Sequence, residues 1–162
     1  MFYEFSQNNS GGSFVVDKNV CHRLFIEADS ASEAIRKAED LGCYWNGVSE
    51  GQDCSCCGDR WDRTTEPIDM KELQTYPVYI WDHNKNAEKL WEKLYSEYRV
   101  VSAPKWIDEK GMKRYVGSIG FDSVEQYAQF LADEYSSGCK PEIRIFYRDG
   151  KRKEIFNQKN KK

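Results

Sequence analysis

Three of the six cysteines in the chain lie close together, at Cys54, Cys56 and Cys57, and Gly58 follows them. The segment therefore contains the Cys-x-x-Cys-Gly spacing of a zinc knuckle, in which two thiolates on a tight turn reach the same ion. We predict a structural Zn²⁺ bound by Cys54 and Cys57. The two remaining ligands would come from Cys56, Cys43, Cys21 or His22.

Two other interpretations of these cysteines stay open. They can be ordinary thiols within a tight turn, without a metal. They can also form a redox or catalytic pair, but a redox Cys-x-x-Cys usually lies at a helix N-terminus, which lowers the thiol pKa. The residues that follow here, Gly58, Asp59 and Arg60, do not obviously begin a long helix.

A polar loop at residues 7–13 is the first candidate for ligand binding. Consecutive backbone amides in such a loop can point at a phosphate. No Lys-Ser or Lys-Thr pair follows the loop and no G-x-G-x-x-G is present, which argues against a P-loop or a Rossmann site. The alternative is a connection between strands that binds nothing. The candidate binding residues are Asn8, Asn9, Ser10, Gly11 and Gly12.

A second candidate follows the cysteines directly. Asp59, Arg60 and Trp61 combine a carboxylate, a guanidinium and an aromatic plane, a set that suits recognition of a nucleotide or of a partner protein. The alternative is structural: an Asp-Arg ion pair and a buried indole that brace the cysteine turn. The two histidines, His22 and His83, show no catalytic pairing in their spacing.

Composition narrows the class of protein. The longest apolar runs are of strand length, far below the roughly 20 residues of a membrane span, so we expect no membrane association. The net charge of -3, with acidic residues among the basic ones, argues against nucleic-acid binding. No basic segment with a following apolar stretch opens the chain, so we expect no export. In a reducing compartment, metal ligation or free thiols are favoured over disulfides.

The first half of the sequence predicts a hairpin, a helix and a short strand. Residues 2–6 and 21–28 have strand character, and they flank the polar loop. A capping box opens a helix that runs from Ser30 to a stop at Gly42. A short strand is expected at 43–45, before the loop that contains the cysteines.

The second half is also mixed. The expected elements are a strand at 75–81, an aromatic-striped helix at 87–98, strands at 99–102 and 114–121, a helix at 122–138, and a hairpin of 142–148 and 151–156. Composition shifts near residues 62–67. We therefore predict an α+β protein in which an N-terminal β-hairpin and helix unit with the cysteine-rich turn, residues 1–66, packs on a second α+β unit, residues 67–162.

Two motifs considered together resemble an uncharacterised family of small tailed-bacteriophage proteins. They are QNNSGGxF at residues 7–14 and DCxCCGDRW at residues 53–61, supported by residues 2–5, the Cys21-His22 strand and the Glu27-Ala28-Asp29 segment before the helix. The similarity covers residues 2–61. It implies a phage early or accessory protein that acts in the cytoplasm of the infected bacterial host, and it transfers no activity to any residue.

The first functional hypothesis is a non-enzymatic phage accessory protein that binds and neutralises a host protein, such as a CRISPR effector in an anti-defence role. It depends on the lack of a complete active site, the moderate charge and the many aromatic residues. The second is a binder that sequesters a nucleotide-like ligand, which requires residues 7–13 to meet Arg60 and Trp61. The third and weakest is a zinc-dependent hydrolase with Asp53 or Asp59 as base.

Overall fold

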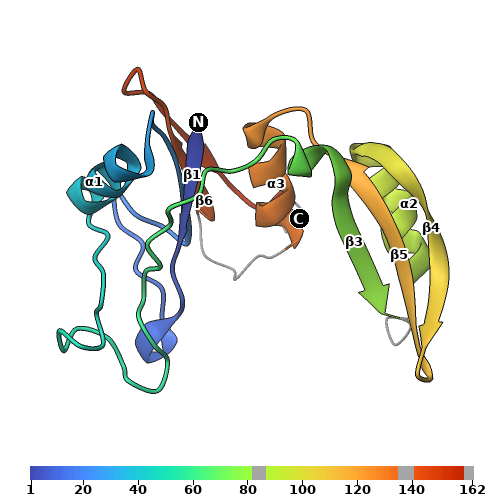
Figure 1. Cartoon of the computed structure of the whole chain (residues 1–162), viewed down its shortest axis with the longest axis horizontal. Coiled ribbons are helices and arrows are strands. Elements are labelled where there is room, and N and C mark those ends of the chain that lie inside the picture. The colour runs from blue at the N-terminus through green and yellow to red at the C-terminus, as the bar shows by residue number, and fades with distance from the viewer. Residues whose placement is uncertain (82–86, 135–140, 159–162) are drawn as a thin grey trace. The chain divides into compact units, whose positions relative to one another are not determined.

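The computed structural model describes residues 1–81, 87–134 and 141–158 and has an α+β fold (Figure 1). It contains two compact units: Met1–Ile68 together with Ala128–Lys162, and Asp69–Tyr127. The boundary between Ile68 and Asp69 lies close to the predicted boundary after residue 66. The predicted second unit is not continuous, however, because residues from Ala128 onward belong to the first unit.

The sheet of the first unit explains this return of the chain. Its strand order is β1-β2-β6-β7, with β1 Phe2–Ser6, β2 Arg23–Glu27, β6 Ile143–Phe146 and β7 Arg152–Ile155. The pairs β1/β2 and β6/β7 are antiparallel, which confirms both predicted hairpins. The two hairpins join through a parallel β2/β6 pair, in which Phe25 lies opposite Ile145.

Helix α1, Ala31–Leu41, forms as its capping residues predict. The Ser30 Oγ accepts a hydrogen bond from the Glu33 backbone N–H at 3.2 Å, and the Glu33 carboxylate accepts one from the Asp29 N–H at 2.8 Å. At the other end Gly42 has φ of 116°, the left-handed conformation that ends many helices. The buried Ala34 and Ala38 let α1 approach the sheet closely.

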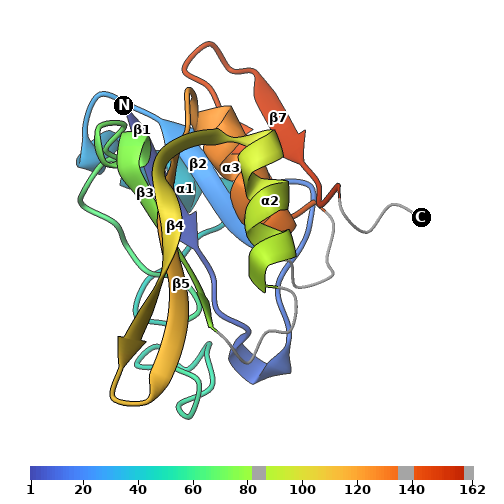
Figure 2. The ribbon, with the colours of Figure 1, turned by 90° about the vertical axis from the view of Figure 1, so that its right-hand side faces the viewer.

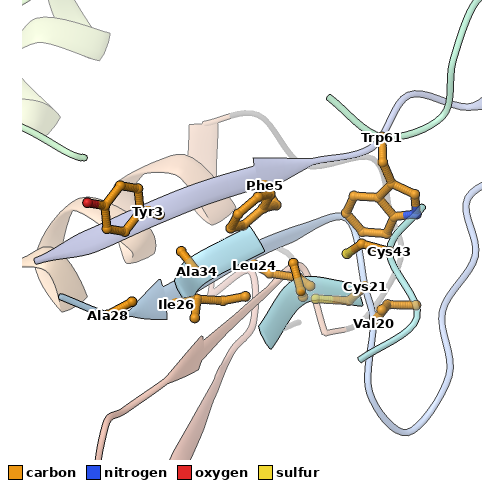
Figure 3. Packing of buried hydrophobic residues seen from close by; sticks show 11 residues of the cluster. Tyr3, Phe5, Val20, Cys21, Leu24, Ile26, Ala28, Ala34, Cys43 and Trp61 are labelled. Carbon is orange, nitrogen blue, oxygen red and sulfur yellow. The ribbon is translucent and has the colours of Figure 1, made fainter. Parts of the chain in front are cut away.

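Helix α1 and the two N-terminal strands enclose the hydrophobic core shown in Figure 3. Its central strand β2 is buried on both faces, since Leu24, Phe25 and Ile26 are all inaccessible. Helix α3, Val124–Glu134, contributes its second half to this unit, and Figure 1 shows α1 and α3 on opposite sides of the sheet. Buried residues of the α1 side are Tyr3, Phe5, Val20, Cys21, Leu24, Ile26, Ala28, Ala34, Ala38, Cys43 and Trp61.

The prediction of a short strand at residues 43–45 is wrong. These residues are not paired in a sheet; they form the exit from α1. The Cys43 N–H bonds to the Ala38 carbonyl at 3.0 Å, and the Trp45 indole N–H donates to the Glu39 carboxylate at 2.6 Å. The backbone is thus held by the end of the helix, and the chain continues into a long loop.

The second unit is built on an antiparallel sheet in the order β3-β5-β4. Its strands are β3 Tyr76–Trp81, β4 Arg99–Glu109 and β5 Met112–Gly120, preceded by the 3₁₀ helix η2 Glu72–Thr75. Strand β4 extends well past the predicted end at residue 102, because it continues into a hairpin with β5 around Lys110 and Gly111, both at positive φ.

Helix α2, Ala87–Glu97, covers one face of this sheet (Figure 2). Its Trp91 is 1% exposed and contacts the Tyr115 ring of β5 edge to face, with centroids 5.7 Å apart. The apolar stripe of α2 therefore contributes to the core of this unit, where Trp91 and Leu94 are buried. The predicted continuation of α3 to residue 138 lies outside the described residues.

Candidate metal centre

The two sequence motifs form one structure. The loop after β1 contains the 3₁₀ turn η1, Ser10–Gly12, and it runs beside the cysteine segment (Figure 1). The Asn8 backbone N–H donates to the Arg60 carbonyl at 2.8 Å, and Gln7 and Trp61 form an antiparallel bridge. The convergence that a ligand site between the two motifs requires is therefore present.

Side chains from the first motif hold the cysteine turn in place. The Asn8 amide donates to the carbonyls of Asp59, at 2.5 Å, and Cys57, at 3.3 Å. The Ser10 hydroxyl, in a residue only 3% exposed, accepts a hydrogen bond from the Cys54 N–H at 3.0 Å. The turn is thus attached at both ends to the loop 7–13.

The residues that hold the cysteine turn form a hydrogen-bonded support, which we call the frame. Arg60 lies at its centre, and its guanidinium is directed inward. Its Nη2 donates to the Ser10 carbonyl at 2.8 Å, and its Nη1 donates to the Ser13 carbonyl at 2.8 Å and to Gln7 Oε1 at 3.2 Å. Its Nε donates to the Tyr44 hydroxyl at 3.2 Å. Because each of its nitrogens already bonds to the protein, Arg60 acts as a brace for the loop.

Asp53 fixes the other side of the turn. One of its oxygens accepts from the Tyr44 hydroxyl at 2.7 Å and the other from the Arg60 backbone N–H at 2.8 Å. Gly47 lies directly beside this carboxylate, and a Cβ on Gly47 would come within 1.8 Å of Asp53 Oδ2. Only glycine leaves space for the carboxylate here.

The cysteine turn itself follows from its local backbone hydrogen bonds. The Cys54 carbonyl accepts from the N–H groups of Cys57, at 3.2 Å, and Gly58, at 3.1 Å. Gly58 has φ of 84°, a left-handed conformation that costs glycine little. This closed turn presents the side chains of residues 54–57 outward, and Cys56 and Cys57 are exposed.

The three sulfur atoms lie close enough to bind one metal ion. The Sγ atoms of Cys54 and Cys56 are 2.7 Å apart, those of Cys56 and Cys57 are 3.6 Å apart, and all three lie within 4.8 Å of one another. Three thiolates form a soft donor set, which suits ions such as Zn²⁺. The turn can therefore hold a metal ion.

The surroundings of Cys54 also prepare it to be a ligand. A hydrogen bond from the Cys56 thiol, followed by backbone N–H groups of Cys56 and Cys57, lowers the pKa of the Cys54 thiol to about 7. The same interaction raises the pKa of the Cys56 thiol to about 11, because loss of its proton would place two negative sulfurs together. Near neutral pH the Cys54 thiol is thus partly ionised beside the protonated Cys56 thiol, and a cation would favour further ionisation.

The other predicted ligands lie elsewhere. Cys21 and Cys43 are in the hydrophobic core of Figure 3, where burial raises their pKa to about 11 and about 12. The His22 ring lies against the Phe14 ring at a tilt of 49°, with centroids 4.0 Å apart, and its Nδ1 is 3.5 Å from the Glu142 carboxylate. Among the described residues, only Cys56 from the predicted additional ligands joins Cys54 and Cys57. The sixth cysteine, Cys139, lies outside the described residues.

The predicted binding residues differ in accessibility. Asn9, Gly11 and Gly12 are exposed at the tip of the loop. Trp61, at 2% exposed, packs in the core, and Arg60, at 9%, is engaged by the loop. The buried indole of the bracing alternative is thus present, but the Arg60 guanidinium lies near Asp53, with Nε 3.8 Å from Oδ1, while Asp59 Oδ1 accepts from the Val48 N–H. The burial of Arg60 and Trp61 argues against direct contact with a ligand.

Two residues of the frame, Tyr44 and Gly47, were not singled out by the sequence. A tyrosine in a loop and a glycine before a polar stretch are common, so neither gives a local signal. Their roles depend on Asp53, which folds back onto both of them. Gln7 stands in the first motif, but its bonds to Val15 and to the Cys21 carbonyl were not expected.

Comparison with curated proteins finds no match, and comparison with solved structures finds none either. A family model does match, over residues 1–93, and it thus includes the whole frame described above together with the start of the second unit. Its description is a domain of unknown function, DUF7296. Since the match includes more than half of the chain, the protein belongs to this family.

Proposed function

We propose that this protein is a non-enzymatic phage accessory protein that binds and neutralises a component of the bacterial host, with a Zn²⁺-loaded cysteine turn as a rigid part of its binding region. The observation that carries the proposal is the display of three thiols on a turn whose supporting polar groups are bonded within the protein. Such a frame presents a fixed surface to a partner. An anti-defence target in the host cytoplasm is the partner class that we expect.

The carboxylates near the turn support binding over catalysis. A zinc hydrolase needs a base that can take a proton from metal-bound water. Asp53 has hydrogen bonds to both of its oxygens, and Asp59 Oδ1 accepts from the Val48 N–H at 2.9 Å. The two acidic residues that could serve as base thus hold the loop together instead.

The choice of Zn²⁺ follows from the donor atoms. Thiolate sulfur favours Zn²⁺ over the hard cations Mg²⁺ and Ca²⁺, which take oxygen ligands. In a tetrahedral site with Zn–S of about 2.3 Å, the sulfurs would be about 3.8 Å apart. The Cys56–Cys57 separation of 3.6 Å is close to this value, and Cys54 and Cys56 need to separate by rotation of exposed side chains.

Sequestration of a nucleotide-like ligand gains less support. The loop and the Arg60 segment do meet, but the guanidinium that would bind a phosphate donates to the Ser10 and Ser13 carbonyls. The indole that would stack on a base is in the core. The exposed tip at Asn9, Gly11 and Gly12 is what remains for a small ligand.

The test measures zinc and partner on the same preparation. The tagged full-length chain is purified under reducing conditions, its metal content is determined by elemental mass spectrometry, and it is used to capture proteins from bacterial host lysate. We compare the wild type with a Cys54→Ser/Cys57→Ser variant and with Ser55→Ala, a matched change in the same turn. Circular dichroism confirms the fold of each variant.

We expect the wild type and Ser55→Ala to carry zinc and to retain a stoichiometric host protein. The double serine variant should lose both while it keeps its fold, because the frame uses backbone groups of the turn rather than its sulfurs. A co-purifying nucleotide without a protein would contradict the proposal and favour sequestration. Equal capture by the double serine variant would refute the role of the turn.

A further inference from the structure

The three-sulfur group is incomplete as a structural zinc site. Structural Zn²⁺ is bound by four protein ligands in a tetrahedron, whereas the described part of the chain brings only Cys54, Cys56 and Cys57 together. His22 and the other described cysteines are in separate environments, against Phe14 and in the core. The fourth ligand therefore has to come from outside this group.

The thiols of the turn are accessible from outside the protein. Cys56 and Cys57 are exposed, and the hydrogen bonds that hold the turn come from the loop 7–13, from Arg60 and from residues 44–48. A second molecule can thus approach the sulfurs without displacing the frame. The occupant should offer thiolates, because soft sulfur ligands match those already in the turn.

We propose that a second copy of this chain completes the site, so that two cysteine turns form one Zn₂Cys₆ cluster at a dimer interface. The inference rests on the proposed zinc site. Two tetrahedral ions have eight coordination positions, and six thiolates fill them when two of the sulfurs bridge both ions and the other four are terminal. One turn alone leaves one position open on its ion, whereas two turns leave none.

The charge of the proposed cluster and the protons released on its assembly can be counted. Two Zn²⁺ and six thiolates give a cluster charge of two minus, and each chain gives up to solvent whatever protons its three thiols still carry. Assembly should weaken on acidification, because protons compete with Zn²⁺ for the sulfurs.

Native mass spectrometry of the full-length chain, with light scattering after size-exclusion chromatography, tests the inference. The reduced, metal-free protein is titrated with Zn²⁺ alone. We expect a monomer without metal and a dimer with two zinc ions once one equivalent has been added. A chelator should restore the monomer.

Three variants test the predicted number of zinc ions per dimer and the source of the ligands. Cys56→Ser leaves four thiolates per pair of chains, so the dimer should bind one zinc ion instead of two. Ser55→Ala should behave as the wild type. Cys139→Ser tests whether that cysteine supplies the fourth ligand within one chain, and our inference requires that this variant bind zinc and dimerise unchanged.

The outcomes separate the inference from the proposed zinc site. A zinc-loaded monomer at all concentrations would overturn the dimer and leave the zinc site standing, and loss of zinc from Cys139→Ser would do the same. Absence of zinc binding by the wild type would overturn both. Dimerisation without zinc would show that another surface holds the two copies, and it would also refute the cluster.

Discussion

Replacement of Arg60 by methionine should strongly destabilise the first unit. Methionine keeps much of the length and volume of the arginine stem but has no donor for the loop. The change leaves the Ser10 carbonyl without its buried donor and removes the donor to the more accessible Ser13 carbonyl, whereas Gln7 Oε1 keeps its hydrogen bond from the Val15 N–H at 2.9 Å. Each buried acceptor left unsatisfied costs about 1–3 kcal/mol.

With one buried acceptor left unsatisfied and one more accessible bond lost, the free energy of unfolding should fall by roughly 2–3 kcal/mol. That is a substantial fraction of the total stability of a typical domain, which is about 5–15 kcal/mol. Urea unfolding followed by tryptophan fluorescence measures the change, since the neighbouring Trp61 is buried in the same unit. Far-UV circular dichroism serves as a second probe of the same transition.

Arg63→Met is the matched control. Arg63 is exposed, so its replacement should change the free energy of unfolding by no more than about 0.5 kcal/mol. If Arg60→Met lowered stability by less than about 1 kcal/mol, the guanidinium would not brace the loop, and its inward hydrogen bonds would have to be replaced by water at little cost. A ligand-binding role for Arg60 would then become the better explanation.

Three further changes test separate parts of the structure. Gly47→Ala should lower the free energy of unfolding by about 2–3 kcal/mol, because its Cβ would displace the Asp53 carboxylate from both of its donors, and urea unfolding measures this. Ser30→Ala should cost about 1 kcal/mol by the same measurement, because it removes the N-cap of α1. In the metal-free protein, iodoacetamide should modify Cys54 before Cys56, with a rate that rises through pH 7 as the Cys54 thiolate forms. Peptide mass spectrometry identifies the modified cysteine. A first reaction at Cys56 would contradict the lowered pKa of Cys54.

The sequence by itself determined the features that depend on neighbours along the chain. The capping box and Gly42 predicted both ends of α1, since a helix end is satisfied by groups within a few residues. The last hairpin was predicted from its two adjacent strand segments, and Asp149 and Gly150, with φ of 86° at Gly150, form the short turn between them. The spacing of the cysteines predicted a tight turn with its sulfurs close together, because a single backbone turn decides that geometry.

Only the tertiary structure decided which distant segments pair. The parallel β2/β6 pair returns residues from Ala128 onward to the first unit, and no local pattern gives the partner of a buried strand. The same holds for Arg60, whose acceptor at Ser10 lies 50 positions earlier in the chain. Its residue type suits a ligand and a brace equally well, and the choice depends on which carbonyls the fold brings within reach of the guanidinium.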